Sequence, residues 1–293
     1  MRPQLVDKLM FCRIAMERMP ICMKIETIYR YDGCREIYLT AYLLDDVDRC
    51  PFHHVRPALL VCPGGGFSSC SNREAEPIVM HFAAQGYQVF VLQYSLREHA
   101  AFPAPIGDAA WAMQTIRREA KRFYVNPQKV AVMGFSAGGY IAAGLSVFFA
   151  DRSVLKGETR GAARPDAAVL CYPVLTAGRE HAHEGSIRLL LGETPDTPQR
   201  RAALSLENHI PSNMPPVFLW HTADDKSVDV ENSLLFAGAL AKREIPFDLH
   251  IFETGHHGLA DCSLRTCDKS HPYPARWLML AQEWLGKQLK FRT

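Results

Sequence analysis

Short apolar runs alternate with longer amphipathic stretches along most of this chain, beginning near residue 23. The later runs are almost continuously apolar, as in Val130-Ala131-Val132-Met133, and such runs are typical of strands buried on both faces of a parallel sheet. Eight segments are therefore predicted to be strands: Ile25–Tyr31, Glu36–Leu44, Ala58–Cys62, Gln88–Gln93, Lys129–Gly134, Ala167–Cys171, Val217–His221 and Phe247–Phe252.

Amphipathic stretches of helix length separate most of the predicted strands. In one of them Val230, Leu234, Ala237 and Ala241 recur at spacings of three and four, which forms a single apolar stripe. This alternation predicts right-handed strand–helix–strand units in one parallel sheet, preceded by two antiparallel strands. The expected helices cover about residues 73–85, 106–122, 137–149, 230–242 and 274–289.

The expected fold class is α/β, with a mostly parallel, twisted sheet and helices on both faces in a single domain over residues 23–293. Residues 1–22 lack the strand-like pattern, so we expect a poorly ordered extension or a mis-assigned start, with Met23 as the alternative start. Residues 151–165 and 176–200 are polar and irregular in pattern, and the second is expected to form an insertion on the substrate side.

The charge balance, the cysteines and the absence of long apolar runs indicate which partners and which compartment to expect. The 33 Lys and Arg residues nearly balance the 31 Asp and Glu residues, and no five-residue run is dominated by Lys or Arg, so no nucleic-acid partner is expected. Nine scattered cysteines without a Cys-x-x-Cys pair predict no metal site and a reducing compartment. The sequence contains no 18-residue apolar run and no signal-peptide pattern, so a cytoplasmic protein without membrane contact is expected.

The strongest chemical motif is Gly134-Phe135-Ser136-Ala137-Gly138. It falls between a predicted strand and a predicted helix, so the serine occupies the strand-to-helix turn. A serine at such a turn lifts its Oγ above the sheet edge as a nucleophile, and small neighbours let helix and strand approach each other. A glycine-rich turn with an incidental serine would contain the same residues, but the flanking elements favour a catalytic serine.

Pro63-Gly64-Gly65-Gly66-Phe67 follows another predicted strand and is the candidate oxyanion loop. Glycines let backbone N–H groups face a cavity without an obstructing Cβ, so the N–H groups of Gly65, Gly66 and Ala137 are expected to bind the oxyanion. The segment does not fit a phosphate-binding loop, because no Lys-Ser or Lys-Thr pair follows it. A plain loop after a strand is the competing interpretation.

A general base is expected late in the chain, because hydrolases with such a serine turn place serine, acid and histidine in that order. Gly255-His256-His257-Gly258-Leu259 lies just beyond the last predicted strand. His257, which is followed by Gly-Leu, is preferred to His256 as the base.

Asp224 and Asp225 compete for the role of the acid that orients the imidazole. Asp225 begins an Asp-x-x-Val pattern whose Val228 would pack under the loop, whereas counting from the strand end favours Asp224. Asp225 is preferred, and Asp229 is expected to cap the following helix. The gaps of 89 residues (225 − 136) and 32 residues (257 − 225) leave room for two strand–helix units and for one helix plus one strand.

Together these motifs resemble the α/β-hydrolase esterases described as acetylxylan-esterase-like or feruloyl-esterase-like, relatives of the dienelactone-hydrolase and prolyl-oligopeptidase catalytic domains. The resemblance covers nearly all of the chain from residue 24 and implies a single-domain α/β hydrolase that needs no cofactor. It also implies a triad of Ser136, Asp225 and His257. Besides GFSAGG and PGGGF, the motifs that carry it are Leu92-Gln93-Tyr94-Ser95-Leu96, Cys171-Tyr172-Pro173-Val174, Leu219-Trp220-His221-Thr222 and Val230-Glu231-Asn232-Ser233-Leu234.

One departure from the family pattern affects the acid. The family usually has Val-Pro-Val where this chain has Val228-Asp229-Val230. Because this adds a carboxylate to the loop, Asp224 stays a candidate for the acid beside Asp225.

The resemblance implies a serine carboxylesterase that removes acyl groups, chiefly acetyl, from small or carbohydrate esters such as acetylated xylo-oligosaccharides. A serine peptidase of the prolyl-oligopeptidase type is disfavoured, because no gating domain fits before the first predicted strand. A non-catalytic ligand-binding protein is disfavoured, because nucleophile, base, acid and oxyanion loop all occur together. The expected partner is a small-molecule ester, and the oligomeric state, a homo-oligomer included, is left open.

Overall fold

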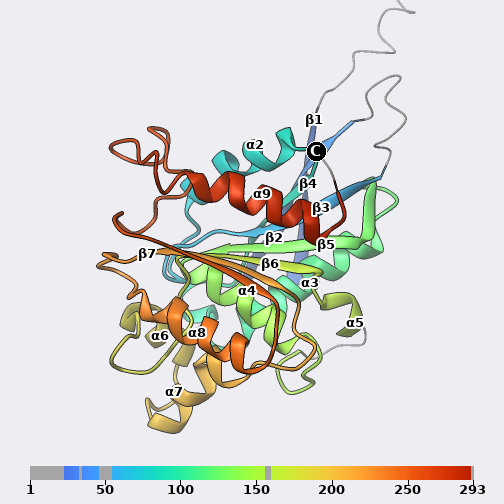
Figure 1. The fold of residues 1–293 in the computed structure, drawn as a ribbon. Coiled ribbons are helices and arrows are strands. Elements are labelled where there is room, and N and C mark those ends of the chain that lie inside the picture. The colour runs from blue at the N-terminus through green and yellow to red at the C-terminus, as the bar shows by residue number, and fades with distance from the viewer. Residues whose placement is uncertain (1–22, 33–34, 46–54, 156–159, 292–293) are drawn as a thin grey trace, which may run out of the picture.

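The computed structural model describes residues 23–32, 35–45, 55–155 and 160–291 (Figure 1). The predicted N-terminal extension, residues 1–22, lies outside the described residues. Eight strands form one sheet in the order β1-β2-β4-β3-β5-β6-β7-β8, and each corresponds to a strand predicted from the sequence. They are β1 (Met23–Asp32), β2 (Arg35–Leu44), β3 (Arg56–Cys62), β4 (Gln88–Gln93), β5 (Val125–Phe135), β6 (Ala167–Cys171), β7 (Val217–Thr222) and β8 (Phe247–Phe252).

The sheet is antiparallel at one edge and parallel over the rest. β1 pairs antiparallel with β2, and β2 pairs antiparallel with β4. The remaining neighbours, from β4 through β3, β5, β6 and β7 to β8, all pair in parallel. The carboxyl ends of the parallel strands therefore meet at one edge, which is where ligands bind in open α/β sheets.

Helices cover both faces of the sheet, as expected. α2 (Glu76–Ala84) and α9 (Arg276–Gln288) lie on one face, whereas α3 (Ala104–Arg118), α4 (Ala137–Phe148) and α8 (Glu231–Lys242) lie on the other (Figure 1). Successive strand residues point to opposite faces, so the core forms two apolar clusters. In β3, Leu60 packs into the cluster under α3 and α4, and Leu59 packs into the cluster under α2 and α9.

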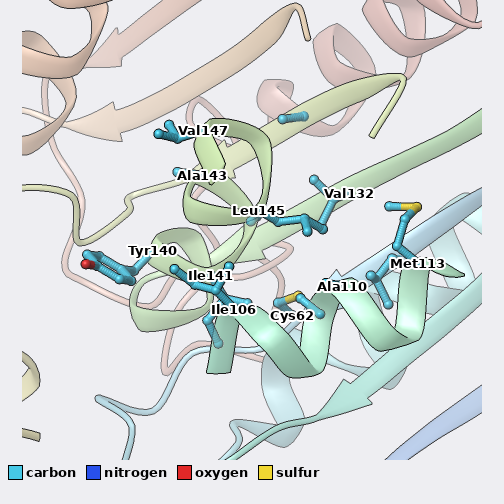
Figure 2. Packing of buried hydrophobic residues seen from close by; sticks show 14 of the residues in the cluster. Cys62, Ile106, Ala110, Met113, Val132, Tyr140, Ile141, Ala143, Leu145 and Val147 are labelled. Atoms are coloured by element: carbon cyan, nitrogen blue, oxygen red, sulfur yellow. The ribbon is translucent and has the colours of Figure 1, made fainter. Parts of the chain in front are cut away.

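The helix that follows the serine turn is wholly buried and packs closely against α3 (Figure 2). Ile106 of α3 and Ile141 and Leu145 of α4 belong to one cluster with Val132 of β5. A Cβ at Gly144 would lie only 2.5 Å from Cδ1 of Ile106, so the glycine lets the two helices approach. This packing fixes the helix that begins directly after Ser136.

The two stretches that are polar and irregular in pattern, residues 151–165 and 176–200, contain helices that the sequence analysis did not predict. The first contains the short helix α5 (Arg160–Ala163), and the second contains α6 (Glu184–Leu191) and the start of α7 (Pro198–Leu204). These helices are too short to show a repeated apolar stripe, which is why periodicity did not reveal them.

Side-chain caps and ion pairs hold α6 and α7 in place. The side chains of His183 and Thr197 accept hydrogen bonds from backbone N–H groups in the first turns of the two helices. The buried Arg201 forms ion pairs with Glu184 of α6 and with Asp196, which precedes α7. The insertion is therefore an ordered pair of helices. Within the described parts of the chain, no helix is long and apolar enough to cross a membrane.

Candidate active site

Ser136 lies on a strained turn between β5 and α4. Its backbone has φ +52° and ψ −118°, a conformation that a residue with a Cβ rarely adopts. The turn is forced by close backbone contacts, because a Cβ on Gly134 would lie 2.1 Å from the carbonyl oxygen of Gly138, and one on Gly138 would lie 2.0 Å from that of Cys62. The small residues of the motif are thus required by this geometry, and the turn presents the serine at the carboxyl edge of the sheet.

Ser136, His257 and Asp225 form a continuous chain of hydrogen bonds. Nε2 of His257 lies 2.8 Å from Oγ of Ser136, and Nδ1 of the same ring lies 2.7 Å from Oδ2 of Asp225. The three residues come from the loops after β5, β7 and β8, and 121 residues separate the serine from the histidine. The imidazole can accept a proton from the serine while the carboxylate fixes its tautomer.

Asp225 is held as an anion by its surroundings. Oδ1 accepts hydrogen bonds from the backbone N–H groups of Ser227 and Val228, at 2.8 and 3.0 Å. Burial raises the pKa of Asp225, but hydrogen bonds from His221, His257 and Val228 outweigh burial and hold this pKa well below its ordinary value. Asp225 is therefore negatively charged at neutral pH.

The two alternatives considered from the sequence lie nearby but make different contacts. Asp224 is exposed, and its Oδ1 accepts a hydrogen bond from the N–H of Gly255 at 2.7 Å. Nδ1 of His256 lies 2.8 Å from the backbone carbonyl oxygen of His257. The expectation that Asp229 caps the next helix was wrong: Val230 is the N-cap of α8, and Asp229, one residue earlier, accepts a local hydrogen bond from the N–H of Glu231.

The glycine loop after β3 lies directly beside the serine. The N–H of Gly64 donates to Glu74, which leaves Gly65 and Gly66 as the loop's candidate oxyanion donors. Both have positive φ, +127° and +61°, and a Cβ on Gly65 would lie 2.1 Å from the carbonyl oxygen of Ser69. Ala137 is the first residue of α4, so its N–H has no acceptor within that helix.

The glycine loop is connected to the loop after β8 that carries His257, here called the histidine loop. The connection is made by Glu74, a buried residue that was not identified from the sequence. Glu74 is 3% exposed; its Oε2 accepts from Gly64 N–H at 2.7 Å, and its Oε1 accepts from the hydroxyl of Tyr172, also at 2.7 Å. The Tyr172 hydroxyl in turn accepts from the N–H of Ala260, and the Tyr172 ring packs edge-on against His257. Burial raises the pKa of Glu74, while the hydrogen bonds from Tyr172 and Gly64 oppose that rise.

Helix α6 brings further polar groups to the edge of the site. A Cβ on Gly66 would lie 3.9 Å from both Cε1 of His183 and Oγ of Ser186. Burial lowers the pKa of His183, and the nearby charge of His257 lowers it further. The segment expected as a substrate-side insertion therefore contributes a neutral imidazole and a hydroxyl beside the glycine loop, although neither residue stood out in the sequence.

The sheet topology and the arrangement of these loops define an α/β hydrolase. The BD-FAE family model matches residues 52–240, which is more than half of the chain. The chain therefore belongs to the BD-FAE family, and the predicted fold class is confirmed.

Named relatives agree with this assignment. The chain is 39% identical over 208 residues to endo-1,4-beta-xylanase B of Butyrivibrio fibrisolvens, covering 70% of this chain and 32% of that protein. It is 30% identical over 205 residues to acetylxylan esterase of Xylanibacter ruminicola, covering 69% of this chain and 40% of that protein. This chain thus spans about a third to two fifths of the length of these curated relatives.

A solved structure extends the similarity to nearly the whole chain. The acetyl ester-xyloside bifunctional hydrolase of Caldicellulosiruptor lactoaceticus superposes with a TM-score of 0.77 at 37% identity, covering 91% of this chain and 93% of that one. The predicted resemblance to acetylxylan-esterase-like α/β hydrolases is confirmed, and the predicted enzyme class, a serine carboxylesterase, agrees with the names of the relatives.

From its two buried hydrogen bonds we expect Glu74 to contribute to the stability of the folded protein. Glu74→Gln keeps the size of the side chain but replaces one acceptor oxygen with a donor amide, so either Gly64 N–H or the Tyr172 hydroxyl loses its acceptor. Leaving such a buried group unsatisfied lowers the free energy of unfolding by about 1–3 kcal/mol. Urea denaturation measures the loss, with Glu253→Gln at an exposed position as the matched control. Equal stability of the two variants would contradict this interpretation of Glu74.

Proposed function

We propose that this chain is a serine carboxylesterase that uses Ser136 as nucleophile, His257 as general base and Asp225 as the acid that orients the base. The observation that carries the proposal is the pair of contacts made by one imidazole, 2.8 Å to Oγ of Ser136 and 2.7 Å to the Asp225 carboxylate. Asp224 is not assigned this role, because the imidazole contacts Asp225, whereas Oδ1 of Asp224 accepts from the N–H of Gly255.

Acylation begins with attack of Ser136 Oγ on the carbonyl carbon of the ester, while Nε2 of His257 takes the serine proton. In this proposal the N–H groups of Gly65, Gly66 and Ala137 donate hydrogen bonds to the developing oxyanion, and the ionised Asp225 stabilises the imidazolium. The bond between the carbonyl carbon and the alcohol oxygen then breaks. His257 gives its proton to that oxygen, so the alcohol leaves and the acyl group stays on the serine.

Deacylation repeats the same steps with water as the nucleophile. Water attacks the acyl carbon and gives a proton to Nε2 of His257. The bond to Ser136 Oγ breaks as His257 returns the proton to that oxygen, which releases the carboxylic acid and restores the free enzyme. All proton transfers pass through one imidazole, so no cofactor is required.

The proposed substrates are acetyl esters of xylo-oligosaccharides. Support comes from the names of two relatives, an acetylxylan esterase and an acetyl ester-xyloside hydrolase. Further support comes from His183 and Ser186, whose polar side chains beside Gly66 suit a hydroxyl-rich alcohol better than an alkyl chain.

The nucleophile is tested by Ser136→Ala. Only the attacking oxygen is lost, so turnover of p-nitrophenyl acetate should fall on the order of 10⁶-fold, as for removal of a triad serine elsewhere, with thermal unfolding little changed. Steady-state kinetics and a melting curve on the same preparation measure both effects. Retention of most of the activity would contradict the proposed mechanism.

The acid is tested by two asparagine substitutions under identical conditions. Asp225→Asn should lower turnover by about 10³–10⁴, because the amide favours the wrong imidazole tautomer. Asp224→Asn should lower turnover tenfold or less, because an amide oxygen still accepts from Gly255. A large loss confined to Asp224→Asn would assign the acid to Asp224 instead.

Substrate class is tested with esters of increasing acyl length beside a natural-type ester. We expect kcat/KM to be highest for p-nitrophenyl acetate and to fall toward octanoate, and we expect acetate release from acetylated xylo-oligosaccharides. Ser136→Ala is the control for spontaneous hydrolysis. Preference for octanoate together with no release from the oligosaccharides would refute the substrate assignment while leaving the esterase mechanism standing.

A further inference from the structure

Three side chains with metal-ligating atoms gather on the surface next to the histidine loop. They are His256, Asp268 and His271, and one ligand atom from each lies within 4.8 Å of the others. Nε2 of His256 lies 3.7 Å from Oδ1 of Asp268, and the two imidazole rings meet edge to face with centroids 5.2 Å apart. Nothing in the proposed esterase mechanism uses these groups.

The hydrogen bond of His256 fixes which of its nitrogens is available. Nδ1 lies 2.8 Å from the backbone carbonyl oxygen of His257, and because a carbonyl can only accept, Nδ1 must carry the proton. In the neutral ring Nε2 then presents a lone pair toward the carboxylate of Asp268, which also offers only lone pairs. A cation between the two atoms would attract both lone pairs. A histidine that donates its other ring N–H to a backbone carbonyl is typical of metal ligands.

His271 provides an independent observation. Its Nε2 is buried, yet it has no hydrogen-bond partner among the residues that the structure describes. A buried polar atom without a partner destabilises the folded state, and a ligand outside the chain would relieve this cost. One ring nitrogen of His271 lies within 4.8 Å of the ligand atoms of His256 and Asp268.

We propose that His256, Asp268 and His271 bind a divalent transition-metal ion of the zinc type, with solvent as the fourth ligand. Two imidazoles and one carboxylate suit zinc, whereas magnesium and calcium prefer oxygen ligands throughout. Tetrahedral zinc with bonds of roughly 2.0–2.1 Å needs ligand atoms about 3.3 Å apart. The 3.7 Å separation is already close to that value, and the exposed Asp268 can move to complete the site.

The site is separate from the triad, although it adjoins it. Both ring nitrogens of His257 are occupied, one by Ser136 and one by Asp225, so His257 supplies no ligand. Bound zinc would link residues 15 apart (271 − 256) across the loop that follows β8. It would therefore hold the loop that carries the proposed general base.

The experiment uses the full chain after removal of metal with a chelator. Zinc is titrated by isothermal calorimetry, and the melting temperature is measured with and without zinc. We expect one zinc ion to bind at this cluster and the melting temperature to rise when zinc is added. Calcium and magnesium should produce no comparable response. His271→Ala and Asp268→Asn should each weaken this binding at least about tenfold. His99→Ala, which removes a histidine that lies outside the cluster, is the matched control and should bind as the unaltered chain does.

Circular dichroism without metal shows whether each variant is folded, and His271→Gln serves as a second substitution if the alanine variant unfolds. The proposal is overturned if the unaltered chain binds no zinc. It is also overturned if the folded His271 and Asp268 variants bind zinc as tightly as the control, because the ion would then be held elsewhere. An equal response to calcium would refute the assigned class of metal.

Discussion

The structure depends on one steric constraint, the close approach of the turn after β5 to the strand beside it. Gly134 and Gly138 contact backbone atoms at distances that leave no room for a Cβ, and this forces Ser136 into a positive-φ conformation. The backbone of Ser136 is strained, and the buried packing of α4 against α3 holds the turn in this conformation. Because the turn fixes the position of Ser136, the loops after β7 and β8 can place Asp225 and His257 within hydrogen-bond distance in line with it.

Behind the turn, buried polar contacts hold the loops to one another. Glu74 accepts from the oxyanion loop at Gly64 and from Tyr172, whose hydroxyl accepts from the histidine loop at Ala260. A buried carboxylate is unfavourable unless its oxygens are satisfied, and here both accept short hydrogen bonds. These hydrogen bonds therefore tie the glycine loop after β3 to the loop after β8 that carries His257.

Strands and long helices could be predicted because their apolar positions repeat several times, as in the stripe of α8. The short helices α6 and α7 could not be predicted in this way, although Thr197 followed by Pro198 is a typical N-terminal capping pattern. The serine motif is local and was found in the sequence, whereas the choice between Asp224 and Asp225 depends on which carboxylate the loop turns toward His257. Glu74 and His183 reach the site only through the fold, so no spacing along the chain reveals them.

Mapping where a serine-reactive phosphonate attaches tests the proposed nucleophilic role of Ser136 most directly. In the proposed mechanism the hydrogen bond between Ser136 and His257 activates this hydroxyl, so a phosphonate should react with it in preference to the other serines. After treatment, intact mass spectrometry counts the adducts and peptide sequencing places them. We expect a single adduct per chain on Ser136, with loss of esterase activity in step with labelling. Inactivation with the adduct on another residue, or full labelling of Ser136 with activity retained, would contradict it.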